Sequence, residues 1–317
     1  MENYEEELHH SHDKLFKMAF QQKQTVVDFL THFFPPELTA HINLDKLRLD
    51  PTNYISRKMD EFFSDIVYRT TWKNTRKPLA IALLFEHKKT PSSRIYLQFL
   101  EYQLGIWHAD IAHKRALTIV IPIVIYQGKR GWSKKTFPQY FKDLPDLLQR
   151  FIPNFDYHLM AIAELDGGKI LSFSDASLLR TLLLTYKYLD DTAFVESHFA
   201  EFFDFFKEHP ELEALLHIFV EYFFKNSGID EETLKDLVAE FLDSQLKPKV
   251  MSTYEQLIRK GRIEGKIEGE IQGEIKGRTE MLRNAWRKGY SISQMADLAG
   301  WSVDEIKKLV EQFEKEN

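Results

Sequence analysis

The spacing of apolar residues divides the chain into a first part of mixed helices and strands and a long helical part. Apolar residues recur three and four apart between residues 13 and 34, which predicts a helix that Pro35 and Pro36 end. Leucine and phenylalanine recur at the same spacing over residues 176–245. We therefore expect helices in both places, with the strands between them.

The strand signals lie between residues 63 and 128. FSDIVYRTTW (63–72) and LAIALLFEHK (79–88) are rich in β-branched and aromatic residues, and the polar KNTRKP between them predicts a hairpin. LTIVIPIVIYQG (117–128) is apolar on both faces, as an interior strand covered by helices would be, although Pro122 disfavours a central ladder position. A long amphipathic helix is expected over 93–116. These elements predict a mixed α/β (α+β) core, followed by a helical region and a helical tail.

The hairpin determines which residues of the two strands are neighbours. If KNTRKP is a six-residue connection, Trp72 faces Leu79 and Asp65 faces Glu86. Directly opposed side chains lie about 5 Å apart at Cβ. Lys88 shares the face of Glu86, because a strand alternates with a period of two. Two carboxylates and one ammonium group are therefore expected at one end of the hairpin.

Two carboxylates that face each other repel, so this arrangement suggests a divalent cation between them. Mg2+, or Mn2+ in its place, takes one or two carboxylates with waters and a phosphate, and the main-chain carbonyl of His87 could add to the set. The metal would acidify a water, while Lys88 would orient that water or stabilise the anionic transition state. This is nuclease chemistry. A pairing shifted by one residue would turn Asp65 to the other face.

The tripeptide Glu-x-Lys is not specific by itself. It occurs four times, starting at Glu86, Glu264, Glu274 and Glu305, and the first copy alone follows a strand pattern. The opposed acid 21 residues earlier therefore carries much of the argument for a site at Glu86.

Composition narrows the class of protein. The 317 residues include no cysteine, which excludes a disulfide scaffold and cysteine-based zinc sites and fits a reducing compartment. The acidic start has no signal-peptide pattern, and no apolar stretch approaches the roughly 20 residues that span a bilayer. We therefore expect a cytoplasmic protein without a membrane anchor.

Charge is distributed unevenly along the chain. The net charge is −6, but residues 69–135 hold thirteen Lys and Arg against three Asp and Glu, a local net of +10. Such a segment fits a phosphate-backbone footprint on DNA. The alternative is a solvated face that acidic neighbours balance in the fold. The residues chosen as DNA-backbone contacts are Lys73, Arg76, Lys77, Lys89 and Arg94.

Several motifs together resemble a known family. HDKLFK (12–17), FSDIVY (63–68), FEHK (85–88) and VIPIVIYQGK (120–129) follow the order of the recombination-promoting nuclease (Rpn) family, also described as a putative transposase family. A helix carrying Arg94, Gln98 and Tyr102 lies between the last two, and the resemblance covers residues 10–290. It implies a PD-(D/E)XK nuclease: a restriction-endonuclease-like mixed sheet flanked by helices that hydrolyses DNA with a metal ion.

The resemblance also implies roles for individual residues. Asp65 and Glu86 take the metal-ligand positions, Lys88 is the catalytic lysine, Asp13 assists the metal and Gln98 supports the site. Two further matches, Asp166 and Tyr102, carry no assigned role. The motif name has Pro before the first Asp, where this chain has Ser64.

Simpler interpretations compete with several of these roles. Asp13 could be a surface helix residue and Gln98 a core residue. His9, His10 and His12 resemble a metal cluster, but solvated side chains at a frayed terminus are the better interpretation. Trp107 and Tyr126 are expected in the core.

The tail contains a four-residue repeat. Gly261, Gly265, Gly269, Gly273 and Gly277 alternate with Ile263, Ile267, Ile271 and Ile275. Five glycines inside a helix cost about 5 kcal/mol relative to alanine, so a helical repeat needs a compensating interaction. Glycine at every fourth position lets a second helix approach closely, and the isoleucine row beside it supplies apolar surface. We expect homo-oligomerisation through this segment; a flexible charged linker is the alternative.

The last residues read as two short capped helices. Ser291 with Gln294 and Ser302 with Glu305 form capping boxes on either side of Gly300, in a pattern resembling a helix-turn-helix. The final helix has a charge of −2, so we expect it to contact protein rather than DNA. The expected divisions are a nuclease-like core (1–175), a helical extension (176–248), the glycine repeat (249–278) and the tail (279–317).

The sequence thus predicts a Mg2+-dependent DNA endonuclease acting in recombination or mobile-element processes. Two alternatives stay open: a non-catalytic DNA-binding or strand-joining accessory protein, and a helical interaction module with a decayed nuclease core. Metal binding through Asp65 and Glu86 distinguishes the first from the second. Salt-dependent DNA affinity distinguishes the second from the third.

Overall fold

The computed structural model describes residues 12–50, 65–75, 77–86, 94–173 and 177–315 of the chain, with the backbone alone described at 65, 82–86 and 315. The chain forms two compact units, Met1–Tyr254 and Glu255–Asn317. Among the described residues, no helix combines the length and the apolar character that crossing a bilayer requires.

The first unit is built on five strands. They are β1 (Arg48–Asp50), β2 (Asp65–Thr71), β3 (Pro78–Glu86), β4 (Ile119–Tyr126) and β5 (His158–Ala161). A helical segment over 12–20 precedes α2 (Lys23–His32), α3 (Pro36–Thr39) and the 3-10 turn η1 (Leu44–Lys46). Between β3 and β5 lie α4 (Ile95–Ala112), η2 (Phe137–Tyr140) and α5 (Asp146–Gln149).

Helices make up most of the chain after β5. They are η3 (Ile162–Glu164), α6 (Gly167–Leu171), α7 (Leu178–Tyr188), α8 (Thr192–Ser197), α9 (Phe199–Glu208), α10 (Glu213–Asn226) and α11 (Glu231–Phe241). The 42-residue helix α12 (Leu246–Arg287) follows, and then α13 (Ile292–Ala299) and α14 (Val303–Lys315). The glycine repeat lies inside α12.

The sheet is mixed, in the order β1-β2-β3-β4-β5. β1, β2 and β3 pair antiparallel, whereas β3, β4 and β5 pair parallel. The crossover between the parallel strands β3 and β4 is α4. Pro122 pairs with Ala82 of β3, and β5 pairs with β4 only from Ile123 onward, so proline lies where β4 has one neighbouring strand. The prediction of a mixed α/β core with a helical region after it is confirmed.

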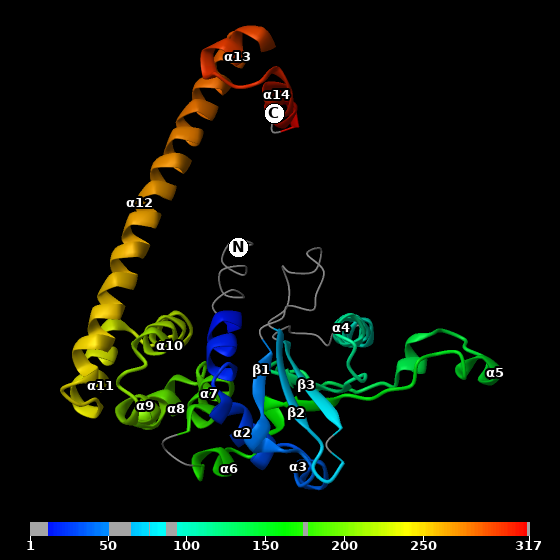
Figure 1. The fold of residues 1–317 in the computed structure, drawn as a ribbon. Coiled ribbons are helices and arrows are strands. Elements are labelled where there is room, and N and C mark those ends of the chain that lie inside the picture. The colour runs from blue at the N-terminus through cyan, green and yellow to red at the C-terminus, as the bar shows by residue number, and fades with distance from the viewer. Residues whose placement is uncertain (1–11, 51–64, 76, 87–93, 174–176, 316–317) are drawn as a thin grey trace. The chain divides into compact units, whose positions relative to one another are not determined.

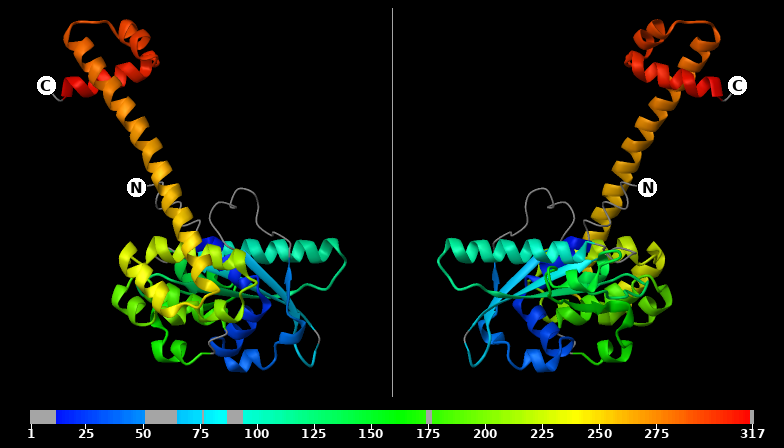
Figure 2. Two further views of the ribbon diagram at one scale, coloured as in Figure 1. Left: turned by 90° about the vertical axis from the view of Figure 1, so that its left-hand side faces the viewer. Right: turned by 90° about the vertical axis from the view of Figure 1, so that its right-hand side faces the viewer.

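Helices cover both faces of the sheet (Figure 1). On one face, Ile66, Ile81 and Ile125 share a core with the segment 12–20, α2 and α7. On the other face α4 lies against the strands, as the two side views in Figure 2 show, and Ile106 of α4 packs on Ala80. Nine of the eleven residues of α7 are buried, so the helical region begins as part of the same core as the sheet.

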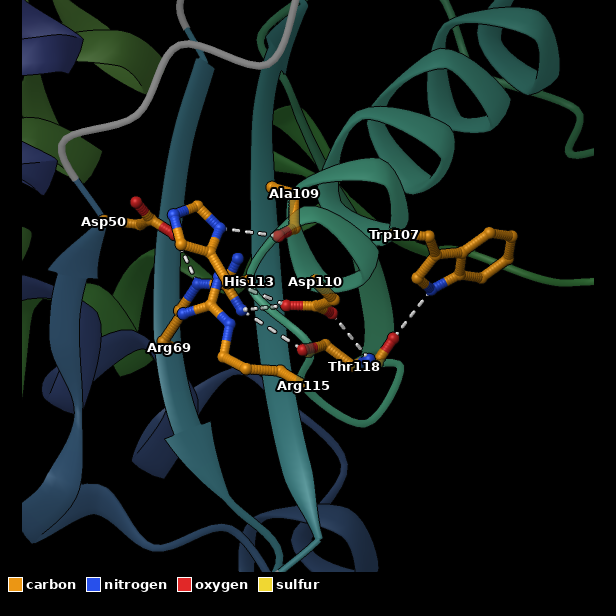
Figure 3. Close-up of polar contacts among 8 residues, drawn as sticks. All are labelled: Asp50, Arg69, Trp107, Ala109, Asp110, His113, Arg115 and Thr118. Carbon is orange, nitrogen blue, oxygen red and sulfur yellow. Dashed lines mark hydrogen bonds and ion pairs between the residues drawn. The ribbon is translucent and has the colours of Figure 1, made fainter.

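A buried ion pair fastens α4 to the strands beneath it (Figure 3). Asp110, in the last turn of α4, is 1% exposed and lies 3.4 Å from Nη1 of Arg69 on β2. The carboxylate also accepts a 2.9 Å hydrogen bond from the backbone N–H of Thr118, just before β4. Arg69 in turn donates to Asp50 of β1 and to the Thr118 hydroxyl, 3.1 Å away. The network therefore joins β1, β2, α4 and the start of β4.

The second unit has a small core of its own. Leu282 of α12, Met295 of α13, and Ile306 and Phe313 of α14 are buried together. Both predicted capping boxes are confirmed: Ser291 with Gln294, and Ser302 with Glu305. Gly300 ends α13 at φ 68°, in the left-handed region that glycine adopts without strain.

Replacing Asp110 by alanine should destabilise the first unit by about 3–5 kcal/mol, because Arg69 would keep a largely buried charge without one of its carboxylate partners. Urea unfolding followed by circular dichroism measures this loss. Asp236→Ala is the matched control, since Asp236 is exposed on α11, and it should change the free energy of unfolding by less than about 0.5 kcal/mol. Equal effects of both changes would contradict a structural role for the Asp110 network.

Candidate active site

Several of the predicted site positions lie at one end of the strands, which we call this edge of the sheet. The parallel strands β3, β4 and β5 all end there, and the antiparallel β2 begins there with Asp65. Glu86, the last residue of β3, pairs with Tyr126, and Tyr126 pairs with Ala161 at the end of β5. The carboxyl ends of parallel strands are where open α/β sheets bind ligands.

The predicted pairing of the hairpin was wrong by two positions. Asp65 pairs with Leu84 instead of Glu86, and Leu79 pairs with Thr70 instead of Trp72. The connection does have six residues, but it runs over 72–77. Since a strand has a period of two, a shift of two keeps positions 65 and 86 on one face, as diagonal neighbours instead of a direct pair.

The shift has a physical cause in the turn. Trp72 follows the last residue of β2 and also bridges Ile42, and its ring stacks on His41 with centroids 5.1 Å apart. The chain then reverses through Asn74 at φ 56°, a conformation that asparagine tolerates better than most residues. The N–H of Trp72 donates to the carbonyl of Lys77 at 2.9 Å, which closes the turn one residue earlier than predicted.

The predicted metal ligands lie mostly outside the described residues. His87, Lys88 and Lys89 fall there, as does Arg76, and the side chains of Asp65 and Glu86 are also outside. In the part of the chain that the structure describes, no group of three His, Asp or Glu side chains could hold a metal ion. The assignments of these residues therefore remain predictions.

The first half of α4 lies over this edge. Val124 and Tyr126, at the end of β4, pack with Ile95 and Phe99 of α4. Gln98 on the same half is 4% exposed, and its Oε1 has no hydrogen-bond partner among the described residues. An unsatisfied buried amide oxygen is costly, so Gln98 is not explained by packing alone.

The two other residues that the motif places on this helix differ in burial. Tyr102 is 3% exposed and packs on Phe99, with ring centroids 6.4 Å apart. Arg94 immediately precedes the helix and is exposed. An exposed position is compatible with the predicted contact of Arg94 with a DNA backbone.

A pocket opens directly after the end of β4. Its volume is about 730 Å3. The lining residues are His12, Gln127, Gly128, Lys129, Arg130, Ala163, Thr185, Tyr186, Lys187, Leu189, Asp190, Tyr222 and Asn226. The pocket therefore combines one end of the first helix, the loop after β4 and two of the later helices, α7 and α10.

His12 and Asp13 belong to the surroundings of this pocket. The expectation of a solvated His12 was wrong: the side chain is 3% exposed, and its Nε2 lies 3.4 Å from the hydroxyl of Tyr222. His9 and His10 lie outside the described residues. Asp13 is half-buried, and its charge contributes to a raised pKa of Tyr186, which lines the pocket.

The two pocket tyrosines are neutral at physiological pH. Burial is the largest cause of the raised pKa of Tyr186, and the neighbouring Tyr222 adds to it. Burial likewise raises the pKa of Tyr222, although a hydrogen bond with Gln127 lowers it. Both phenols thus keep their protons, and the pocket offers hydroxyl groups rather than phenolates to a ligand.

Sequence reasoning missed most of this pocket. The motif VIPIVIYQGK includes Gln127, Gly128 and Lys129 without indicating a pocket, and no motif includes Tyr186 or Tyr222. The motif position directly after a buried strand could have marked the first three. The tyrosines carry no such signal, since they come from helices 60 and 96 residues after Tyr126.

The basic segment does not form one surface in the fold. Lys73 and Lys77 lie in the β2–β3 turn, and the nine residues of β3 place that turn roughly 26 Å along the strand from Glu86. Arg69 is held in the Asp110 network, and Lys134 lies 2.7 Å from Asp156. Part of the segment is therefore balanced by acidic neighbours, as the alternative interpretation proposed.

Asp166 has a local structural role. It precedes α6, and its Oδ1 accepts a 2.7 Å hydrogen bond from the backbone N–H of Lys169. This contact satisfies one of the N–H groups left free at a helix start. The family position thus coincides with a helix cap in this chain.

Gly128→Ala should destabilise the protein by about 1–3 kcal/mol, because an added Cβ would lie 2.0–2.6 Å from the Tyr126 hydroxyl and ring, and Tyr126 is fully buried. Thermal unfolding measures the effect. Gly131→Ala is the control in the same loop, since an added Cβ there meets nothing within 4 Å. If the two variants unfold alike, the Tyr126 ring does not restrict position 128.

Comparison with known proteins places this sequence in a family. The family model described as "Putative transposase, YhgA-like" matches residues 10–215. "Recombination-promoting nuclease RpnA" of Escherichia coli (strain K12) is 29% identical over 119 residues, which are 37% of this chain and 40% of that protein. "Recombination-promoting nuclease RpnC" of the same strain is 24% identical over 175 residues, or 54% of this chain and 57% of that protein.

A third relative is labelled inactive. "Inactive recombination-promoting nuclease-like protein RpnE" of the same strain is 26% identical over 120 residues, 37% of this chain and 39% of that protein. The chain thus spans about half the length of the curated relatives it matches. No solved structure matches the chain significantly. Because the family model covers more than half of the chain, this protein belongs to the YhgA-like putative transposase (Rpn) family.

Proposed function

We propose that this protein is a metal-dependent endonuclease that hydrolyses DNA phosphodiester bonds in recombination or mobile-element processes. The observation that carries the proposal is the sheet edge where Asp65 begins β2 and Glu86 ends β3, on one face of the sheet. Two of its relatives are named as recombination-promoting nucleases, which supports the same reaction class.

The residue types at this edge suit a hard divalent cation. Carboxylates of Asp65 and Glu86, with the carbonyl of His87, are oxygen donors of the kind that Mg2+ and Mn2+ accept. When bound, such an ion would acidify a water and neutralise negative charge on the phosphodiester. Oε1 of Gln98, buried on the helix over this edge and without a partner among the described residues, is a polar atom that such a site could use.

The chain's own residues supply the remaining functions in this proposal. Lys88, two residues after Glu86, would orient the attacking water and stabilise the anionic transition state. Asp13 would assist the metal, and Gln98 would position the groups that contact it. Arg130 lines the pocket beyond β4 and would hold the phosphate backbone next to the cleaved bond, whereas Lys129 in the same lining pairs with Asp190.

A second candidate function is a non-catalytic DNA-binding or strand-joining accessory protein. The relative named as inactive favours it, since the same family includes a nuclease-like protein with that label. This candidate keeps the basic residues near the pocket and does not need Lys88.

Purified protein should nick supercoiled plasmid with Mg2+ or Mn2+ and not with EDTA. Lys88→Ala should lower the nicking rate about 100- to 1000-fold, because it removes a charge that would stabilise the transition state. Lys135→Ala is the control, since it removes an equal and exposed charge from the same basic segment and should nick at close to the wild-type rate.

Three results would change this conclusion. Equal nicking by wild type and Lys88→Ala would place the activity elsewhere or in a contaminant. Loss of nicking in Lys135→Ala as well would show that general DNA affinity, not Lys88, had been measured. Absence of nicking by every protein, together with DNA binding that weakens as salt rises, would favour the accessory protein.

The substitution Gln98→Met tests whether Gln98 acts in the proposed site or only packs in the core. Methionine has a similar size and removes the unsatisfied amide, so the free energy of unfolding should stay the same or rise by up to about 1 kcal/mol. If Gln98 supports the site, the nicking rate falls about tenfold or more while stability is kept. A variant that is equally stable and equally active would remove Gln98 from the proposed site.

A further inference from the structure

A row of exposed isoleucines lies on α12, outside the proposed active site. Ile263, Ile267, Ile271 and Ile275 have 50–55% of their surface exposed. Single exposed apolar residues are ordinary on protein surfaces, but isoleucine is among the most frequently buried residue types. Four at a fixed spacing form a continuous apolar row that no described residue covers.

The glycines do not lie beside this row, which corrects the arrangement expected from the sequence. Each residue of an α-helix turns about 100°, so residues two apart lie about 200° apart, on nearly opposite sides. Gly261, Gly265, Gly269, Gly273 and Gly277 therefore form a second row behind the isoleucines. An added Cβ at any of them meets no described atom within 4 Å, so no contact in the described part of the chain requires glycine there.

Isoleucines four residues apart form the kind of ridge that packs into a groove of another helix. Ridges of i±4 spacing are inclined to the helix axis, and two of them interdigitate when the helices cross at about −50°. The isoleucine row is one such ridge. A second copy of α12 offers the same ridge and the same flanking grooves, so the row can pack on itself around a twofold axis.

Charges beside the isoleucines pair along the single helix, as Lys266 does with Glu270 at 3.9 Å and Arg278 with Glu274 at 2.5 Å, and their order is also self-complementary. The residues one position before each isoleucine form a row on the helix. This row is basic at Arg262 and Lys266 and acidic at Glu270 and Glu274. An antiparallel second helix centred on Gly269 would bring Lys266 and Glu270 of the other copy to within about 3 Å of the same level along the axis. Arg262 would lie opposite Glu274 in the same way.

The row that follows the isoleucines shows the reverse order. It begins with Glu264 and Glu268 and ends with Gln272 and Lys276, so the antiparallel partner would place Glu264 opposite Lys276. In a parallel pair, the row before the isoleucines would face the row after them, so the two rows would only need opposite charges. In an antiparallel pair each row faces its own copy, so its charge must change sign near the middle. Both rows change sign in this way at nearly the same height along α12.

We propose that α12 pairs antiparallel with α12 of a second copy of this chain, through the isoleucine row Ile263, Ile267, Ile271 and Ile275. The proposal does not rest on nuclease activity. The expected partner is a second copy of this chain, because the charges beside the isoleucines would face opposite charges on that copy.

Light scattering of the full chain at micromolar concentration tests the pairing. Wild type should have about twice the 37.5 kDa mass of one chain. Ile267→Glu combined with Ile271→Glu should return the mass of a single chain, with an unchanged helical circular dichroism signal, since both residues are exposed and glutamate favours helix. A single-chain mass for wild type, or a double mass for the variant, would overturn the proposal.

A control on the opposite side of α12 identifies the interface. Gly269→Ala combined with Gly273→Ala adds two methyl groups to the glycine row and leaves the isoleucines unchanged. The mass should remain double. A single-chain mass for this variant would move the interface to the glycine row and overturn the assignment.

Charge reversal tests the antiparallel direction. Lys266→Glu and Glu270→Lys each place like charges opposite one another in a homodimer. A mixture of the two, carried on differently tagged chains, restores opposite charges across the interface. The ratio of mixed dimer to the two homodimers should exceed its statistical value of one roughly fivefold at low salt. A statistical mixture would overturn the antiparallel arrangement.

Discussion

The buried pairing of Asp110 with Arg69 is the interaction on which the position of α4 depends. A carboxylate that is 1% exposed is tolerated in a protein interior only when charges and hydrogen bonds replace its water. Arg69 and the N–H of Thr118 provide this replacement at one point, where β2, α4 and the start of β4 meet. The helix cannot slide along the sheet without leaving that carboxylate exposed to apolar surroundings.

Fixing one end of α4 also fixes what its other end covers. The helix connects two parallel strands, so it must run back along the sheet from the end of β3 to the start of β4. Its first half consequently packs on Val124 and Tyr126, above the edge where the strands end. Gln98 is thereby buried beside the candidate site, although it lies three helical turns from the ion pair.

Much of the fold could be predicted from the sequence, because the strands and helices have clear apolar periods. The pairing register could not, since it depends on where the turn closes, through the N–H of Trp72 bonding to Lys77 and Asn74 adopting a positive φ. The placement of the candidate carboxylates on one face survived this error because the shift was an even number. Charge was less informative, because a count of Lys and Arg does not reveal that Arg69 is held inside the fold.

Within the described residues, the two outer strands of the sheet are short. β1 has three residues and β5 has four, while the interior strands β2, β3 and β4 have seven to nine. An edge strand exposes unpaired N–H and C=O groups, which can recruit a strand from another chain, and a short edge offers few of them. The sheet is therefore poorly suited to lengthening by strand addition or to fibre formation through its edges.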